Sequence, residues 1–243
     1  MIRMDRRVWW AVFLTLLILA VTQANAQVPA DAILQDGTDT VTFLAYKPLE
    51  GSIEKTPGDQ LYLYDTVKSL TRIISSTPTG TVGNAYSDSA SITDAGDKAA
   101  FHSWATNLVA GTPRCANVFL KDVKTGSVSM IKPQALAPDM TPDGKYIVYE
   151  YNADPENTLP AIYRYNTATK EELFIDYTSL GNRKGGWYFP NPQISSDGEV
   201  VTYHTTKSGK VEVWQWQNGM TVKVRDGVLT DAPVKTAVQE ITK

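Results

Sequence analysis

The chain contains a single cysteine, Cys115, and only two histidines, His102 and His204. One cysteine cannot form an internal disulfide, and we expect Cys115 to be a small buried apolar side chain. The chain also has no Gly-x-Ser-x-Gly elbow, Walker loop, His-Glu-x-x-His helix or Cys-x-x-Cys pair. These absences exclude the enzyme and metal-binding classes that those motifs mark.

An excess of positive charge is absent as well. The 23 basic and 26 acidic residues give a net charge of −3 at pH 7. Such a chain lacks the basic surface that nucleic acids or anionic membrane surfaces require. We therefore expect neither as a partner.

The only long apolar run lies at the start of the chain. A basic segment (1–7) precedes the 14-residue run 8–21, and Ala-Asn-Ala follows at 24–26. This order predicts a Sec-type signal peptide over 1–26, cleaved after Ala26, in a periplasmic or secreted protein with no membrane span after cleavage. A retained anchor needs about 20 apolar residues. Residues 27–243 are then expected to form one domain.

Helical periodicity is also missing from residues 27–243, apart from an ambiguous segment at 235–243. Short runs rich in Val, Ile, Tyr, Phe and Thr, such as 145–151 and 199–205, alternate with turn residues. This pattern predicts an all-β fold.

What the chain does contain is a repeat. One phrase occurs at 92–101, 140–149 and 194–203: an apolar residue, Ser or Thr, a turn at Gly96, Gly144 or Gly198, an apolar run and an aromatic residue. The glycines are 48 and 54 residues apart, a spacing typical of propeller blades.

A second phrase follows each copy, and occurs once more upstream. It places an aromatic residue at one position of a predicted strand, and the four copies have Tyr62, Phe119, Tyr163 and Trp214 there. We expect these side chains to pack one repeat on the next. The repeats predict four units of about four antiparallel strands, at 40–76, 90–132, 138–176 and 192–225. Radial packing would protect their edges, so we predict a β-propeller of about four blades.

The opening phrase resembles the TolB-like β-propeller repeat, whose usual wording is Ser-Pro-Asp-Gly-Lys, an apolar stretch and an aromatic residue. Residues 141–145 match it closely and 195–199 match well, whereas 93–97 lack the Asp before Gly. The resemblance spans about 40–225 and implies a propeller that binds a protein or peptide in the periplasm or at the cell envelope. By the spacing of the phrases, the first unit lacks its innermost strand, and we expect a segment within 226–238 to supply it and close the ring.

In a propeller, tight turns and long connections gather on opposite faces. The long segments here are 47–59, 76–88, 104–116, 152–160 and 176–192. Long loops on one rim of a rigid scaffold are where recognition usually occurs. We expect a partner-binding surface on this rim, with these residues contributing: Arg183, Lys184, Trp187, Tyr188, Phe189, Tyr86, Asn107 and Arg114. Alternatively, the three aromatics at 187–189 plug the mouth of the channel.

Two metal-site interpretations are disfavoured. His102, Glu150 and His204 share one slot of the repeat, but equivalent slots on different blades are too far apart to meet at one ion. Asp139, Asp143 and Asp197 lack calcium-loop spacing, and we expect Asp143 and Asp197 to hold their own turns. No metal or other cofactor is predicted.

The favoured function is therefore an exported, non-enzymatic binding or scaffold module for a protein or peptide. Two alternatives stay open: a carbohydrate-active or other hydrolytic enzyme using rim carboxylates such as Glu54 or Glu156, or the propeller accessory of a peptidase assembly.

Overall fold

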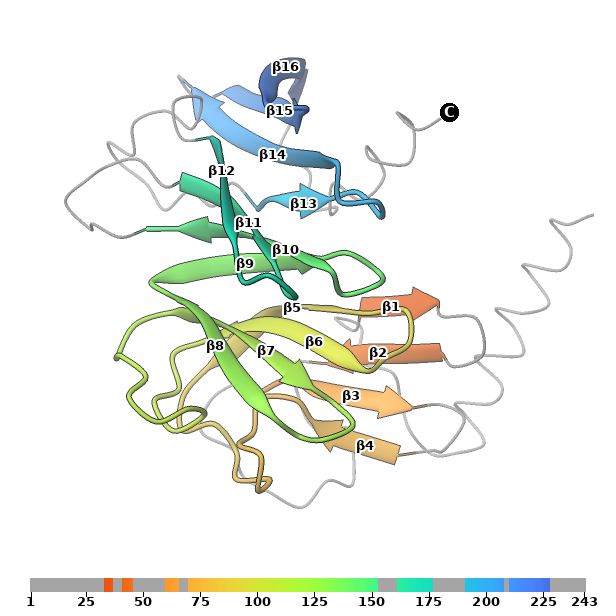
Figure 1. The fold of residues 1–243 in the computed structure, drawn as a ribbon, viewed down its shortest axis with the longest axis vertical. Coiled ribbons are helices and arrows are strands. Elements are labelled where there is room, and N and C mark those ends of the chain that lie inside the picture. The colour runs from red at the N-terminus through yellow and green to blue at the C-terminus, as the bar shows by residue number, and fades with distance from the viewer. Residues whose placement is uncertain are drawn as a thin grey trace, which may run out of the picture.

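A computed structural model describes residues 33–36, 41–45, 60–65, 70–152, 161–176, 191–207 and 210–227. Every regular element in these ranges is a β-strand, and the 16 strands form four separate antiparallel sheets of four strands each (Figure 1). Each sheet uses four strands that are consecutive in the sequence, and we call each sheet a blade. The all-β propeller architecture expected from the repeats is confirmed. No helix in the described ranges is long and apolar enough to cross a membrane.

The strands follow one another from the inside of each blade outward. Blade 1 contains β1 (Ile33–Asp36), β2 (Val41–Ala45), β3 (Tyr62–Asp65) and β4 (Leu70–Ile73). Blade 2 contains β5 (Ser87–Ile92), β6 (Lys98–Ser103), β7 (Asn117–Asp122) and β8 (Val128–Pro133). Blade 3 contains β9 (Ala135–Met140), β10 (Tyr146–Tyr151), β11 (Ala161–Asn166) and β12 (Glu172–Asp176). Blade 4 contains β13 (Gln193–Ile194), β14 (Val200–Lys207), β15 (Lys210–Gln217) and β16 (Met220–Gly227).

Blade 1 differs from the expectation that its innermost strand is missing. β1 supplies that strand, pairing Ile33 with Leu44 and Asp36 with Val41 of β2. The expectation was wrong because β1, Ile-Leu-Gln-Asp, is only four residues long and shows no alternation of apolar and polar residues. Of the segment 226–238 expected to close the ring, Asp226 and Gly227 belong to β16, and 228–238 lie outside the described residues.

The Gly turns join the first and second strands of blades 2, 3 and 4. Gly144 has φ +70° and donates its N–H to Thr141 O at 2.8 Å. The Thr141 hydroxyl donates to Asp143 Oδ1 at 2.6 Å, and that oxygen also accepts the N–H of Lys145 at 2.9 Å. Blade 4 repeats this arrangement with Ser195 and Asp197. Asp143 and Asp197 therefore hold their own turns, as predicted.

The turn of blade 2 makes the same hydroxyl–carboxylate contact with a carboxylate at a different position in the sequence. Ala95 stands before the glycine where the other copies have Asp. Here the Thr93 hydroxyl donates to Oδ1 of Asp97, the residue after the glycine, at 2.6 Å. The repeat has thus kept the hydroxyl–carboxylate contact although the wording of the phrase changed.

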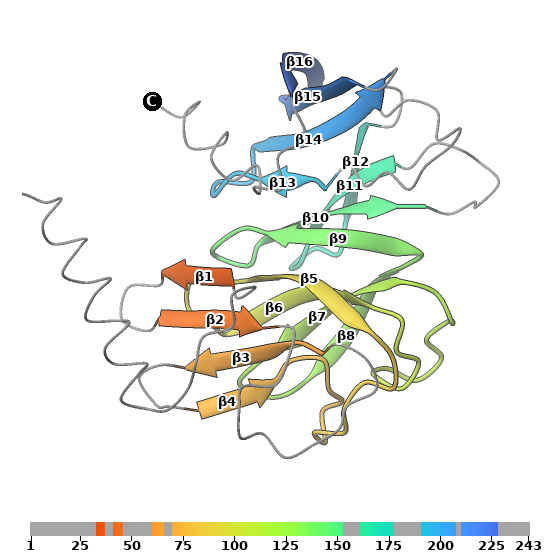
Figure 2. The same ribbon diagram turned by 180° about the vertical axis from the view of Figure 1, so that it is seen from behind.

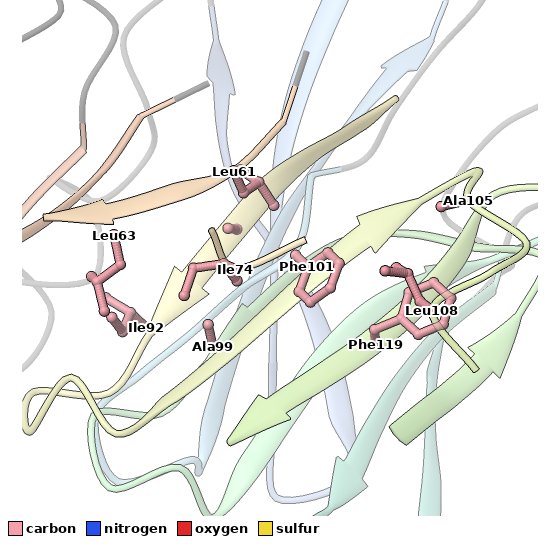
Figure 3. Packing of buried hydrophobic residues seen from close by; sticks show 10 residues of the cluster. Leu61, Leu63, Ile74, Ile92, Ala99, Phe101, Ala105, Leu108 and Phe119 are labelled. Atoms are coloured by element: carbon pink, nitrogen blue, oxygen red, sulfur yellow. The ribbon is translucent and has the colours of Figure 1, made fainter. Parts of the chain in front are cut away.

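Apolar side chains hold successive blades together. Figure 3 shows the cluster between blades 1 and 2, where Leu61, Leu63 and Ile74 pack against Ile92, Phe101 and Phe119. A second cluster joins blades 2 and 3 around Val118, Ile147 and Tyr149, and a third joins blades 3 and 4 around Val148, Tyr203 and Trp216. Within the described ranges, none of the three clusters joins blade 4 to blade 1.

The repeated aromatic position behaves as expected in blades 2, 3 and 4. Phe119 belongs to the cluster facing blade 1, while Tyr163 and Trp214 pack against the clusters facing blades 2 and 3, respectively. Each pairs across the sheet with an aromatic residue of the second strand: Phe101, Tyr149 or Tyr203. Large side chains at this position therefore fill the space between blades, which contributes apolar burial at each interface.

The first strands of the blades lie together. β5 contacts β9, and β9 contacts β13, as both ribbon views show (Figures 1 and 2). The tight turns, including those at Gly96, Gly144 and Gly126, lie at one end of the strands. The long connections 74–86 and 104–116 leave from the other end, which we call the rim.

Candidate functional site

Two loops of the rim are tied together on blade 2. The side chain of Asn84 donates to Thr106 Oγ1 at 3.0 Å and accepts the Thr106 N–H at 2.9 Å. Asn107 accepts the Asn84 N–H and donates to Val82 O, both at 2.9 Å. The loop entering β5 and the loop leaving β6 therefore form one braced surface. Asn107, which we predict to contact a partner, is also part of the brace that joins the loops.

An exposed aromatic pair lies beside this brace. The rings of Tyr86 and Trp104 are 5.6 Å apart between centroids and tilted by 53°. The two residues are 39% and 38% exposed. Tyr86 precedes β5 and Trp104 follows β6, and the Trp104 N–H donates to Tyr86 O at 3.0 Å. Two large aromatic side chains are thus held open to solvent on a rigid edge.

A carboxylate–imidazole pair contacts the aromatic pair. Asp88 and His102 lie opposite each other on β5 and β6, with His102 Nε2 2.7 Å from Asp88 Oδ1. The hydroxyl of Tyr86 donates to Asp88 Oδ2, and the His102 ring meets the Trp104 ring edge-on at 5.0 Å. We call these four residues, Tyr86, Asp88, His102 and Trp104, the aromatic corner.

Strand geometry explains why the four side chains meet. Tyr86 and Asp88 are two positions apart, as are His102 and Trp104, and side chains two apart in a strand share one face of the sheet. A β-bulge lies just beyond, where the register shifts between Asp88 and Ser91 and Ser89 has φ +47°. Bulges commonly re-aim side chains next to functional sites, and this one sets Asp88 opposite His102.

The electrostatics of the corner centre on Asp88. Burial alone would raise the pKa of this carboxyl, but the hydrogen bond and charge of His102, together with hydrogen bonds from Tyr86 and Ser89, outweigh it and lower the pKa. Asp88 is therefore ionised at neutral pH. Its side chain keeps 23% of its surface exposed, whereas the His102 side chain keeps 7%.

The chemistry of the corner is suited to binding. His102 is buried, and its Nδ1 has no hydrogen-bond partner among the described residues. Ser103, its neighbour in sequence, instead donates to Tyr86 O at 3.1 Å and accepts from Ser87 at 2.8 Å. The part of the chain that the structure describes thus pairs Asp88 with His102 without placing a nucleophile on the free ring nitrogen.

Blade 3 has no aromatic residues at the positions that correspond to Tyr86 and Trp104 of blade 2. The Asn152 N–H donates to Gln134 O at 2.9 Å, the counterpart of the bond between Trp104 and Tyr86. Glu150 lies opposite Leu136 there, where blade 2 has His102 opposite Asp88. Blade packing therefore does not require aromatic residues at these two positions.

The remaining sequence-predicted site residues divide into two groups. Arg114 is exposed on the loop 104–116. Arg183, Lys184, Trp187, Tyr188 and Phe189 lie outside the described residues, as do Glu54 and Glu156. Of the predicted rim residues, the structure brings Tyr86 into the corner, while Trp104 and Asp88 were missed. Aligning the copies could have found Trp104, because Asn152 and Thr206 hold its position in the other two.

The residues considered for metal sites lie apart from one another. His102 pairs with Asp88, Glu150 is fully buried on β10, and burial lowers the pKa of His204 on β14. No group of three or more potential metal ligands occurs among the residues that the structure describes. Cys115 is half-buried rather than buried, and its Sγ lies 3.2 Å from Asn117 Oδ1. The loop leaves it partly open because Cys115 stands just before β7.

Comparison with solved structures identifies the fold. TolB from Acinetobacter baumannii superposes with a TM-score of 0.52 at 16% identity over 85% of this chain. A prolyl endopeptidase gives 0.54 at 16% identity over 86% of this chain. This chain covers 47% of that TolB and 32% of that endopeptidase, so it spans less than half the length of either. No protein-family model and no curated protein matches the sequence. In fold, the chain is a TolB-like β-propeller.

Proposed function

We propose that this protein is an exported, non-enzymatic propeller module that holds a protein or peptide partner on its rim. The observation that carries the proposal is the exposed pair Tyr86 and Trp104, at positions where blade 3 has Gln134 and Asn152. Exposing two large aromatics to water is unfavourable unless something covers them, and Trp and Tyr are enriched among residues that dominate binding energy.

The brace beneath the pair supports a binding role. Four hydrogen bonds between Asn84, Thr106, Asn107 and Val82 fix the two loops before any partner arrives. A preorganised surface loses less conformational entropy on binding. A protein or peptide ligand is favoured because the corner is an open edge, which suits a side chain projecting from an extended chain.

The binding proposal can be tested with a displayed random-peptide library. Peptides selected on the full chain are synthesised, and their affinities for the wild type, Trp104→Ala and Phe174→Ala are measured by calorimetry. Phe174 is a matched control, since it is 42% exposed and contacts another aromatic ring but lies on the outer strand of blade 3. Truncation of an aromatic hot spot costs about 2 kcal/mol or more, a loss of roughly 30-fold.

The two outcomes are distinct. Peptides that lose affinity with Trp104→Ala and keep it with Phe174→Ala support the proposal. Failure to enrich any peptide, or equal affinity for both variants, overturns it. Export is tested separately by expressing the chain with residues 1–26 and sequencing the N-terminus of the product, which is expected at Gln27.

A further inference from the structure

The aromatic corner combines exposed ring faces with a nearby carboxylate, and both attract positive charge. Its rings are tilted at 53° to each other with centroids 5.6 Å apart, and Tyr86 and Trp104 are 39% and 38% exposed. The faces of Trp and Tyr rings carry negative electrostatic potential and attract cations within about 6 Å of the ring centre. A flat or compact cationic group can therefore pack against these exposed ring faces.

Asp88 adds a formal negative charge beside the Tyr86 and Trp104 rings. Its Oδ2 accepts from the Tyr86 hydroxyl, and its Oδ1 faces His102 Nε2 at 2.7 Å. The carboxyl of Asp88 is ionised, so it presents a negative charge beside the rings. The side chain also keeps 23% of its surface exposed, so an approaching cation is drawn by a charge that solvent screens only in part.

Apart from His102, no cationic side chain among the described residues forms an ion pair with Asp88. Lys132 lies on the same face of blade 2, two strands across from His102, but its Nζ is 2.7 Å from Glu172 Oε2 and 4.5 Å from the Tyr151 ring. Arg114 is exposed on the loop 104–116, and no ion pair between it and Asp88 occurs among the described residues.

We propose that the aromatic corner binds a cationic side chain, that of Lys or Arg, presented by a peptide or protein partner. This inference rests on the proposed function and names the group that the rim recognises. The cation stacks on Trp104 and Tyr86 while Asp88 attracts it from behind. A sugar could also stack on such rings, but it carries no positive charge, so binding of a neutral sugar separates the two chemistries.

The test uses small probes on the full chain. N-acetyl-arginine amide is titrated while the indole N–H signal of Trp104 is followed by NMR, with the signal assigned from a Trp104→Phe variant. N-acetyl-citrulline amide is the matched control, since it has nearly the same shape without the charge. Cation–π contacts at exposed sites contribute about 0.5–1 kcal/mol, so arginine should bind about two- to fivefold more tightly than citrulline.

The charge of Asp88 is tested with Asp88→Asn, which keeps the shape and the acceptor oxygen. The affinity for arginine should fall, while the affinity for citrulline stays unchanged. If this variant unfolds, a salt titration of the wild type replaces it, because raising the ionic strength should weaken arginine binding and leave citrulline binding unaltered.

Each result has one meaning. Equal binding of arginine and citrulline, no shift of the Trp104 signal with arginine, or a larger shift with a neutral oligosaccharide overturns the inference. The proposed function survives those results if selected peptides still depend on Trp104. If no peptide depends on Trp104, the proposed function fails independently.

Discussion

The carboxylate of Asp139 accepts the backbone N–H of Ile194 at 3.0 Å, a bond from the first strand of blade 3 to the first strand of blade 4. Its other oxygen accepts from the Ser91 hydroxyl of blade 2 at 2.9 Å. Ser91 in turn accepts the N–H of Met140 at 3.1 Å. Ser91 and Asp139 occupy the same place in their blades, so a polar link at this place joins the first strand of blade 2 to that of blade 3, and that of blade 3 to that of blade 4.

Asp139→Asn should lower the free energy of unfolding. Asparagine is uncharged and has a single acceptor oxygen, so it cannot accept from both Ser91 and Ile194. A hydrogen bond to a charged group contributes about 1.5–3 kcal/mol, and urea denaturation should show a loss of that size. Asp122→Asn is the control, because its amide can still accept the Thr125 N–H in an exposed turn. Equal effects of the two substitutions would contradict the role of Asp139.

Gly198→Ala should be much more destabilising than Gly219→Ala. Both glycines have positive φ, +77° and +76°, so each alanine would be strained by roughly 1 kcal/mol. A Cβ at position 198 would also lie 2.4 Å from Cδ2 of Tyr146, whereas nothing lies within 4 Å of a Cβ at 219. The difference between the two variants in thermal unfolding isolates the contact of the blade 4 turn with Tyr146. Similar losses would mean that Tyr146 moves aside freely.

The fold was largely predictable because turns and second strands have strong local chemistry. Gly144 and Gly198 need positive φ, and Asp143 and Asp197 need nearby N–H groups, so the phrase must recur wherever the turn recurs. The innermost strands carry no such signal. β5 reads Ser-Asp-Ser-Ala-Ser-Ile, and its Ser91 is buried through a contact with Asp139 of another blade. A pattern satisfied by partners far away in sequence cannot be recognised locally.

The candidate site was predictable as a region but not as an arrangement. Loop length and composition placed Tyr86 and Asn107 on the rim. The meeting of Tyr86 with Trp104 depends on strand register, which the bulge after Asp88 sets. Asp88 itself lies in a polar stretch that could equally have been a loop. Local sequence reports which residues are present, whereas the register decides which of them face one another.

Because of the turn carboxylates, the free energy of unfolding should decrease at acid pH. The hydrogen bond from Thr141 and then that from the Lys145 N–H lower the pKa of Asp143, and Ser195 and Glu199 do the same for Asp197. Because the folded pKa lies below the unfolded one of about 3.9, this stabilisation is complete above that pH and is lost as the pH falls through the folded value. A double variant, Asp143→Ala with Asp197→Ala, should therefore differ from the wild type more at pH 7 than at pH 2. A difference independent of pH would show that the carboxylate charge contributes nothing.

The interface between blades 3 and 4 offers a direct measurement of how firmly one blade holds the next. The Arg164 guanidinium lies 4.5 Å from the Tyr146 ring centroid and 5.3 Å from that of Trp216, and it donates to Gly198 O. Arg164→Met keeps the apolar stem but removes the planar cation, so it should lower the free energy of unfolding by about 1–2 kcal/mol. Lys145→Met is the control, because Lys145 is exposed although its Nζ lies 4.8 Å from the same tyrosine ring.

A double-mutant cycle of Arg164→Met with Trp216→Leu should give a coupling of at least about 0.5 kcal/mol, as measured by urea denaturation. Additive losses would mean that arginine and tryptophan stabilise the two blades separately.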